Sequence, residues 1–312
     1  MTARPRVVVV TPNPAVDLTY ECAEPHLGEV NRVSRVIRRA GGKGLNVASV
    51  LVQLGLPVRA TGFLGGPGGD EIRCLLAEAP IQQEWAPIAG STRSTTVIVA
   101  TSTTTVFNEP GPVVTAADWR ALTTLSLDGL RPGDVFVMAG SYPPGTAPAA
   151  VIDLLSAARA AGARTVVDTS GASLLEVAAW ADLVKPNREE LAQATGSASL
   201  EDGVRVLIEA GARAVVVSAG EDGMDLFLPS SAGLRGWHAA PARVVQGNPT
   251  GAGDAAVAAL VASLLADPTA GPLRPEALAP AVALSAAAVL MPVAGAVDLD
   301  AYRQFLPNVK VS

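Results

Sequence analysis

Cysteine is scarce in this chain. Its 312 residues include two cysteines, Cys22 and Cys74, and their spacing fits neither a zinc site nor a redox pair. This argues against a disulfide framework, and we expect free thiols in a reducing cytoplasm. Aromatic residues are also few, at 4%. The low aromatic content disfavours an aromatic-rich binding face, whereas abundant Ala, Val and Leu suit parallel strands packed between helices.

Positive charge is in deficit as well, with 23 Lys and Arg against 29 Asp and Glu. The resulting net charge of -6 argues against nucleic acid as a partner, so any anion must be bound by a local site. A long uninterrupted apolar run is missing too, because residues 277–293 contain Pro280, Ser285 and Pro292. This segment predicts a buried helix and no membrane contact. The first ten residues lack a secretory signal, and we expect a cytoplasmic protein.

The order of apolar segments predicts an α/β fold. Residues 7–10 form a β-branched run typical of a strand buried on both faces. After Asp134, strands and helices alternate, and Gly162 and Gly211 lie where helices should end. We expect a mainly parallel central sheet flanked by helices, with ligands at the carboxyl ends of its strands. The expected strands are 135–138, 165–167, 183–184 and 214–217, and the expected helices are 147–160, 173–179, 188–194 and 200–209.

Four short, partly alternating segments interrupt this pattern. They predict a small antiparallel sheet with one solvent-facing side, inserted into the main domain as a lid. We expect one domain over residues 1–312, with the lid formed by about 16–38 and 92–110. Its apolar residues Val97 and Val99 suggest a homodimer that forms through the lid. The four segments are 18–22, 30–37, 95–100 and 103–107.

The most informative motif is a glycine-rich turn at residues 248–254 that leads into an Ala-rich helix. Gly251 and Gly253 let the backbone approach a ligand closely, and a helix start favours a phosphate. Asp254 lies in the same turn, where the helix start should keep it ionised. An ionised carboxylate beside a phosphate cradle can accept the proton of an attacking hydroxyl, which indicates phosphoryl transfer to an alcohol. A simple loop with Asp254 as N-cap is the alternative.

A second glycine-rich turn, residues 41–46, also enters a helix and carries Lys43 and Asn46. It lacks the GxxxxGK[ST] spacing of a Walker A loop and the third glycine of a dinucleotide fingerprint. The alternative is a flexible turn with a solvated lysine. Asp17, after the first strand, is placed to hold sugar hydroxyls or to stabilise a turn. Arg93 and Ser141 are candidates for binding a substrate phosphate, although an isolated arginine is more often a surface charge.

Two further strand ends carry polar residues. Asn187 and Glu190 lie three residues apart at a helix start, so both can face one magnesium ion or its waters. The same spacing is typical of a capping box, with Asn187 as the N-cap. Residues 218–223, with Gly220 and Gly223, end another strand and can approach a nucleotide or form a plain hairpin turn.

Together these motifs resemble one family. The segments GGKGLNVASVLVQLG at 41–55 and NPTGAGDAAVAAL at 248–260, with TPNPAVD, GSYPPG, KPNREE and SAGEDG in the same order, are similar to those of the PfkB (ribokinase-like) carbohydrate kinases. The resemblance covers almost the whole chain and implies a ribokinase-like fold, with ATP and Mg²⁺ as cofactors. The NPAVD start, the lysine in GGKG and the Thr92-Arg93 pair resemble the branch that contains 1-phosphofructokinase and tagatose-6-phosphate kinase.

The resemblance also implies roles for individual residues. A catalytic base is implied at Asp254, with an anion hole formed by Gly251, Ala252 and Gly253. Magnesium would be held, through water, by Asn187 and Glu190. ATP would be bordered by Lys185, Asn187, Glu190, Ser218, Gly220 and Gly223. The sugar would be held by Asp17, Gly42 and Asn46, and its existing phosphate by Lys43, Arg93 and Ser141.

The acceptor is expected to be a ketohexose phosphate. AGGKGLNV and DTSGASL at 168–174 resemble tagatose-6-phosphate kinases, which we expect, while FNEPGP at 107–112 resembles 1-phosphofructokinases. Because the C1 and C6 arms of a ketohexofuranose are related by a pseudo-twofold axis, one pocket can hold either end. Fructose 1-phosphate, fructose 6-phosphate and an unphosphorylated sugar or nucleoside stay open as acceptors, as does a non-catalytic sugar-phosphate sensor. An oxidoreductase is disfavoured because no GxGxxG turn follows the first strand.

Overall fold

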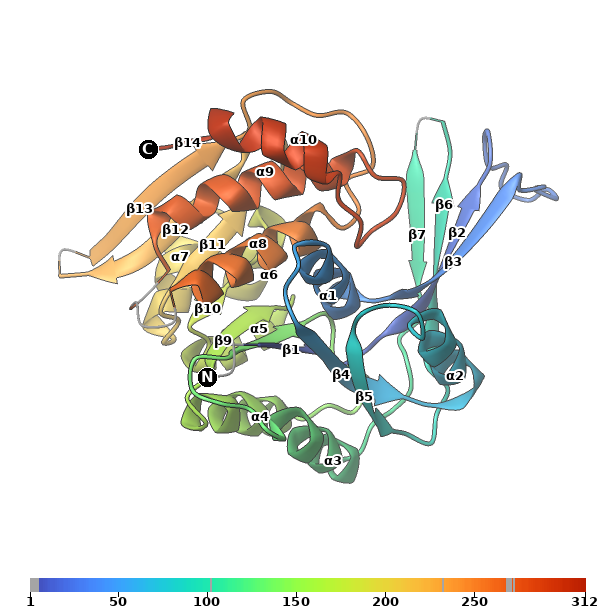
Figure 1. Ribbon diagram of the computed structural model, residues 1–312, viewed down its shortest axis with the longest axis horizontal. Helices are drawn as coiled ribbons and strands as arrows, with labels where there is room; N and C mark the ends of the chain where they lie inside the picture. The colour runs from blue at the N-terminus through green and yellow to red at the C-terminus, as the bar shows by residue number, and fades with distance from the viewer. Residues whose placement is uncertain (1–5, 102, 232, 268–270, 272) are drawn as a thin grey trace.

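A computed structural model describes residues 6–101, 103–231, 233–267, 271 and 273–312. In this part of the chain, a ten-stranded sheet is covered by helices on both faces, and a separate four-stranded sheet projects from one side (Figure 1). We call the first part the body and the four-stranded sheet the lid.

The body sheet has the strand order β14-β13-β12-β11-β10-β9-β8-β1-β4-β5. Neighbours from β11 to β5 pair in parallel, whereas β12, β13 and β14 are added antiparallel beyond β11. The predicted mainly parallel sheet is therefore confirmed. Its strands are β1 (Val7–Thr11), β4 (Val58–Leu64), β5 (Gln82–Pro87), β8 (Val135–Ala139), β9 (Arg164–Asp168), β10 (Leu183–Val184), β11 (Val215–Ser218), β12 (Met224–Ser230), β13 (Gly233–Ala240) and β14 (Lys310–Val311).

Two helical layers bury the two faces of this sheet, as the alternation along β1 requires. Val7 and Val9 belong to one hydrophobic cluster, and Val8 and Val10 to the other. The first cluster is shared with α1 (Lys43–Gln53), α2 (Gly66–Leu75), α8 (Ala252–Ala266) and α9 (Leu278–Val289), with α10 (Leu299–Phe305) packed against it. The second is shared with α3 (Ala116–Leu127), α4 (Pro148–Ala160), α5 (Ala172–Val177), α6 (Arg188–Thr195) and α7 (Leu200–Glu209).

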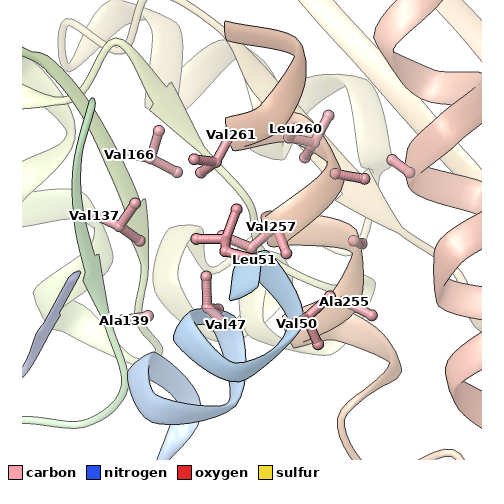
Figure 2. Packing of buried hydrophobic residues seen from close by; sticks show 14 of the residues in the cluster. Val47, Val50, Leu51, Val137, Ala139, Val166, Ala255, Val257, Leu260 and Val261 are labelled. Atoms are coloured by element: carbon pink, nitrogen blue, oxygen red, sulfur yellow. The ribbon is translucent and has the colours of Figure 1, made fainter. Parts of the chain in front are cut away.

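The packing of α1 against α8 matters most for the site. Figure 2 shows Val47 and Leu51 of α1 directed toward Val257 of α8, with Val137 of β8 and Val166 of β9 beside them. These side chains are fully buried. Burial of aliphatic side chains contributes about 1.5–3 kcal/mol each, so this contact fixes the two helices relative to the sheet. The first turns of α1 and α8, which carry the two glycine motifs, are thereby held in place at one end of the sheet.

The lid consists of β2 (Ala15–Glu21), β3 (Arg35–Gly41), β6 (Arg93–Val99) and β7 (Thr104–Asn108), in the order β3-β2-β6-β7. Its two outer pairings are antiparallel, as predicted, but the central pair β2–β6 is parallel. The difference arises because β2 and β6 come from two distant segments of the chain, and the sequence shows no local signal for how such strands pair.

One strand boundary was predicted wrongly. The expected strand at 30–37 is displaced to Arg35–Gly41, and residues 30–34 are exposed and outside any strand. Gly41 pairs with Ala15, so β3 continues directly into the turn before α1. The buried helix expected within 277–293 is confirmed as α9. None of the helices in the described ranges is long and apolar enough to span a membrane.

Candidate active site

The start of α8 forms the centre of the site. Gly251 is the N-cap residue and has φ 87°, a left-handed conformation that favours glycine. Ala252 and Gly253 are the first residues of the helix. Among the described residues, the backbone amides of Gly253 and Asp254 donate no hydrogen bond. Since a helix start also carries partial positive charge, these free amides can bind an anion.

Asp254 lies next to these amides and is buried, with 6% of its surface exposed. Its Oδ2 accepts a hydrogen bond of 2.8 Å from Asn46 Nδ2, while no described residue donates to its Oδ1. Burial, followed by the charge of Asp168, raises the pKa of Asp254 to about 7, against the opposing effects of Lys43, Asn46 and Lys185. The expectation that the helix start keeps Asp254 ionised is therefore wrong near neutral pH. A pKa near 7 instead suits a general base.

A charged cluster extends from Asp254 toward the ends of β9 and β10. Lys43 Nζ donates to Asp168 Oδ1 at 3.2 Å and to Glu190 Oε1 at 3.0 Å. Lys185 Nζ lies 3.6 Å from Asp168 Oδ2. Burial lowers the pKa of Lys43, but the carboxylates of Asp168, Glu190 and Asp254 outweigh it and raise that pKa above its usual value. Both lysines are therefore held by carboxylates from distant segments.

Lys185 also lies close to the start of α8. A Cβ added at Gly253 would be 3.5 Å from Lys185 Nζ, so this ammonium group lies beside the free amides. The side chain of Lys185 is 3% exposed. The amides and the ammonium group together provide positive charge in a region shielded from water.

Asp168 was not assigned a role by sequence reasoning. It is 1% exposed, it ends β9, and it contacts both lysines of the cluster. Its segment was used only as a point of resemblance. The signal that could have identified it is its position, because an aspartate that directly follows a buried parallel strand lies at the ligand-binding edge of the sheet.

Asn187 and Glu190 form the capping box that was the structural alternative. Glu190 N donates to Asn187 Oδ1 at 2.7 Å, and Asn187 N donates to Glu190 Oε2 at 2.9 Å. Glu190 also holds Lys43 through its other oxygen, so capping places this carboxylate in the charged cluster. No group of three His, Cys, Asp or Glu side chains suited to a metal ion occurs in the ranges that the structure describes.

A pocket of about 310 Å³ opens beside the start of α8. Gly220 and Gly223 line it, as does Ala252, and most of the other lining is aliphatic. Ser218 lies at the adjacent end of β11, where it forms a parallel bridge with Asn187. A largely apolar pocket next to an anion cradle is the arrangement that a nucleotide base and its phosphates require. Of the residues expected to border ATP, Gly220 and Gly223 thus line one pocket with Ala252, and Ser218 and Asn187 are joined to each other by the bridge.

A second, much smaller pocket of about 30 Å³ lies on the other side of Asn46, between the lid and the body. Asp17 lines it from β2, and Gly42 is the N-cap residue of the adjoining helix α1. Burial raises the pKa of Asp17 to about 6, although Arg93 and Arg39 oppose the shift. A Cβ at Gly41 would collide with the carboxyl group of Asp17, so a glycine is required there. Val97 and Val99, which suggested a lid interface, line this pocket.

Arg93 and Ser141 converge on a third polar group, Asn13. Arg93 Nε donates to the Asn13 carbonyl oxygen at 3.2 Å, and Asn13 Nδ2 lies 3.4 Å from Ser141 Oγ. Lys43, expected beside them, has its ammonium group paired with Asp168 and Glu190. The structure thus brings Arg93 and Ser141 together around Asn13, whereas the ammonium group of Lys43 belongs to the charged cluster.

Comparison with known proteins bears on the family and the fold of the chain. The model of the pfkB family carbohydrate kinases matches residues 10–299. A curated 1-phosphofructokinase of Xanthomonas campestris is 38% identical over 85% of this chain and 86% of its own length. A tagatose-6-phosphate kinase of Staphylococcus epidermidis is 32% identical over 83% of this chain and 85% of its own. The structure of Escherichia coli phosphofructokinase-2 in complex with fructose-6-phosphate superposes with a TM-score of 0.84 at 26% identity, covering 97% of this chain and 98% of that one.

Proposed function

The chain belongs to the pfkB family of carbohydrate kinases, and from this premise we propose that it transfers the γ-phosphoryl group of ATP to a primary hydroxyl of a ketohexose phosphate. The observation that carries the proposal is the pairing of Asp254, whose Oδ1 is free, with the free amides of Gly253 and Asp254. The carboxylate accepts the proton of the hydroxyl, and the amides bind the phosphoryl group that replaces this proton on the oxygen. This is the combination that a hydroxyl acceptor needs.

In the proposed reaction, the acceptor hydroxyl lies between Asp254 and the γ-phosphorus. Its oxygen forms a bond to phosphorus while the bond from phosphorus to the bridging oxygen of ATP breaks, and ADP leaves. The proton moves to Asp254 Oδ1, whose raised pKa of about 7 makes it a stronger base than an ordinary carboxylate. The amides at the start of α8, with Lys185 beside Gly253, stabilise the negative charge on the transferred group.

ATP would occupy the 310 Å³ pocket and extend its phosphates along the start of α8. Gly220 and Gly223 border the base end, and Lys185, Asn187, Glu190 and Ser218 lie toward the phosphates. We assign the anion hole to Gly251, Ala252 and Gly253, because the left-handed turn at Gly251 exposes the amides that follow it.

The residues present also fit a magnesium ion. Asp168 Oδ2 is buried and has no hydrogen-bond partner. The carboxylate of Glu190 contacts the same ammonium group, that of Lys43, as Asp168 does. Oxygen ligands of this kind are those that Mg²⁺ prefers, and it is commonly held through water. We propose that Asn187 and Glu190, with Asp168, would hold it. When bound, it would neutralise charge on the ATP phosphates.

The acceptor would enter from the lid side, with Asp17, Gly42 and Asn46 at its ring and Arg93, Ser141 and Lys43 at its phosphate. The 1-phosphofructokinase of Xanthomonas campestris is 38% identical to this chain, and the tagatose-6-phosphate kinase of Staphylococcus epidermidis is 32% identical. This order favours fructose 1-phosphate, whereas the segment resemblances favour tagatose 6-phosphate. The related arms of the two sugars allow one site to accept both.

The test is a coupled ADP-release assay with tagatose 6-phosphate, fructose 1-phosphate, fructose 6-phosphate and the free ketohexoses, each at saturating ATP and magnesium. We expect turnover with at least one ketohexose phosphate and little with the free sugars, because Arg93 and Lys43 require an anionic group. A protein that is stabilised against heat by a sugar phosphate but releases no ADP with any of them would be a sensor and not a kinase.

We also propose a homodimer formed by the outer face of the lid. Val36 is 46% exposed and Phe107 is 57% exposed, which leaves apolar surface on the lid strands. The Phe107→Asp variant should shift the sedimentation coefficient from that of a dimer to that of a monomer. Sedimentation of the wild type as a monomer at micromolar concentration would contradict this proposal.

A further inference from the structure

Arg39 is a charged lid residue whose role neither the motifs nor the comparisons address. It lies on β3 and lines the 30 Å³ pocket together with Asp17 and Asn46. It is only partly exposed, although it lies on a short strand of the lid. An arginine side chain turned into a small pocket with many apolar residues in its lining needs a reason, because the exposed surface nearby would solvate it better.

Strand register explains the direction of this side chain. Arg39 is paired directly with Asp17 on the neighbouring strand β2, so the two side chains share one face of the lid. Arg38 occupies the opposite face, where its guanidinium makes a two-point ion pair with Glu71 at 2.6 and 2.8 Å. Two adjacent arginines therefore serve different surfaces, and only Arg39 faces the acceptor pocket.

The contacts of Arg39 reach across this pocket to the body. Its Nη1 donates a hydrogen bond of 2.7 Å to the carbonyl oxygen of Ala294, in the segment between α9 and α10. A Cβ added at Gly251 would be 2.8 Å from the Cα of Ala294, so this segment packs directly on the first turn of α8. A single residue thus connects the lid to the segment that supports the proposed anion hole.

The guanidinium group has further donors available. Within the described part of the chain, Arg39 makes no hydrogen bond other than the one to Ala294. Its other N–H groups lie in the same pocket as the carboxylate of Asp17, which accepts hydrogen bonds. A donor and an acceptor side by side match the hydroxyl groups on adjacent carbons of a sugar ring.

We propose that Arg39 is a specificity-determining residue of the acceptor site, which donates to a ring hydroxyl beside Asp17 and holds the lid to the body through Ala294. This inference rests on the proposed function, because it assumes that a sugar phosphate occupies the pocket between lid and body. About 30 Å³ holds one or two water molecules and not a sugar, so the lid moves outward when the acceptor enters. Arg39 then donates a hydrogen bond to the sugar, either in place of its hydrogen bond to Ala294 or in addition to it.

In this proposal, the choice between acceptor sugars depends on a lid residue, Arg39. Fructose and tagatose differ only in the configuration at C4, so their ring hydroxyls present different directions to the Asp17 and Arg39 pair. A site that binds a hydroxyl through a charged donor discriminates against an epimer that misplaces it. Arg39 acts on acceptor binding and on lid closure, while ATP binds on the other side of Asn46.

The experiment compares Arg39→Ala and Arg39→Lys with the matched control Arg38→Ala. For each protein, kcat and KM are measured for ATP, for fructose 1-phosphate, and for the two C4 epimers fructose 6-phosphate and tagatose 6-phosphate, with ATP hydrolysis in the absence of acceptor. In Arg39→Ala, we expect the acceptor KM to rise about tenfold or more, because a hydrogen bond from a charged group is lost. The ATP KM should stay within about twofold, since a distant site is unaffected.

Three further readouts separate this role from general damage. In Arg39→Ala, the ratio of kcat/KM for the two epimers should move toward one. Added guanidinium ion should restore part of the acceptor affinity of this variant. The acceptor KM of Arg39→Lys should lie between those of the wild type and Arg39→Ala. Arg38→Ala should match the wild type in every kinetic value. If wild type phosphorylates a ketohexose phosphate and Arg39→Ala retains its acceptor KM and epimer ratio, this inference fails alone. A wild type inactive on all of them overturns the proposed function and this inference together.

Discussion

The two sides of the site are constructed differently. On the ATP side, the groups come from the body and contact one another already: Lys43 and Lys185 are paired with Asp168, beside an open pocket of about 310 Å³. On the acceptor side, half of the groups come from the lid, and the enclosed space is about 30 Å³. Under the proposed assignment of ATP and acceptor to these two pockets, the nucleotide site is preformed and the acceptor site is completed by lid movement. Such an order of assembly keeps water away from the activated phosphate.

The largest expected effect comes from the preformed side. Asp168→Ala removes the carboxylate shared by Lys43 and Lys185, leaving a buried ammonium group without its partner. Breaking a buried ion pair in this way costs about 3–5 kcal/mol of the free energy of unfolding, measured by urea denaturation. The control Asp222→Ala removes only an exposed pair with Arg188 and should cost less than about 1 kcal/mol. Equal losses in the two variants would mean that the charged cluster is not structurally important.

An intermediate effect is expected on the acceptor side. In Gly41→Ala, the added methyl group collides with the Asp17 carboxyl group and displaces it. We expect the acceptor KM to increase about tenfold or more because a carboxylate hydrogen bond is lost, with little change in the ATP KM. Gly236→Ala, on β13, is the matched control, since the nearest atoms to the added methyl group belong to the ring of Phe227, at 3.1 and 3.3 Å. A parallel rise in both KM values of Gly41→Ala would contradict the separation of the two sides.

The smallest effect is a dependence on pH. The base must be ionised to accept a proton, and the pKa of Asp254 is about 7, so lowering the pH protonates it. The turnover number at saturating substrates should therefore fall about fivefold between pH 7 and pH 6. Asp17, with a pKa near 6, adds a further loss in kcat/KM for the acceptor below that pH. A turnover number that is constant from pH 5.5 to 8 would exclude Asp254 as the base.

The same shift affects stability with a definite sign. Because the folded pKa of Asp254 is raised above its ordinary value of 3.8, its protonated form stabilises the fold fully below about pH 4, and that stability is lost as the pH rises through 7. Asp254→Asn cannot ionise. Its melting temperature should therefore exceed that of the wild type more clearly at pH 8 than at pH 5, and an equal difference at both values would argue against the raised pKa.

Local patterns predicted much of the fold and two helix starts that surround the proposed site. The spacing of Asn187 and Glu190 predicted a capping box, and the Gly251 turn predicted a helix start, because each depends on residues within one helical turn. The parallel strands were equally recognisable from their β-branched runs. These features need no knowledge of how distant segments meet.

Features that depend on tertiary contacts were missed. Asp168 acquires its role from lysines 125 residues before it and 17 after it, at positions 43 and 185. The raised pKa of Asp254 follows from burial and from the charge of Asp168, a residue 86 positions earlier in the chain. Arg39 lies outside the expected strand at 30–37, yet it pairs with Asp17 and shares its face of the lid. Local sequence carries no signal for any of these.

The central claim is that Asp254 accepts the proton of the acceptor. It is tested most directly by the turnover number of Asp254→Asn with a ketohexose phosphate, with the Kd for ATP determined by titration calorimetry on the same preparation. Asparagine keeps the shape of the side chain and an oxygen for the Asn46 hydrogen bond. We predict a turnover number lower by about 10²–10⁴ and a Kd for ATP within about threefold of the wild type. A variant that retains near-normal turnover would contradict the account.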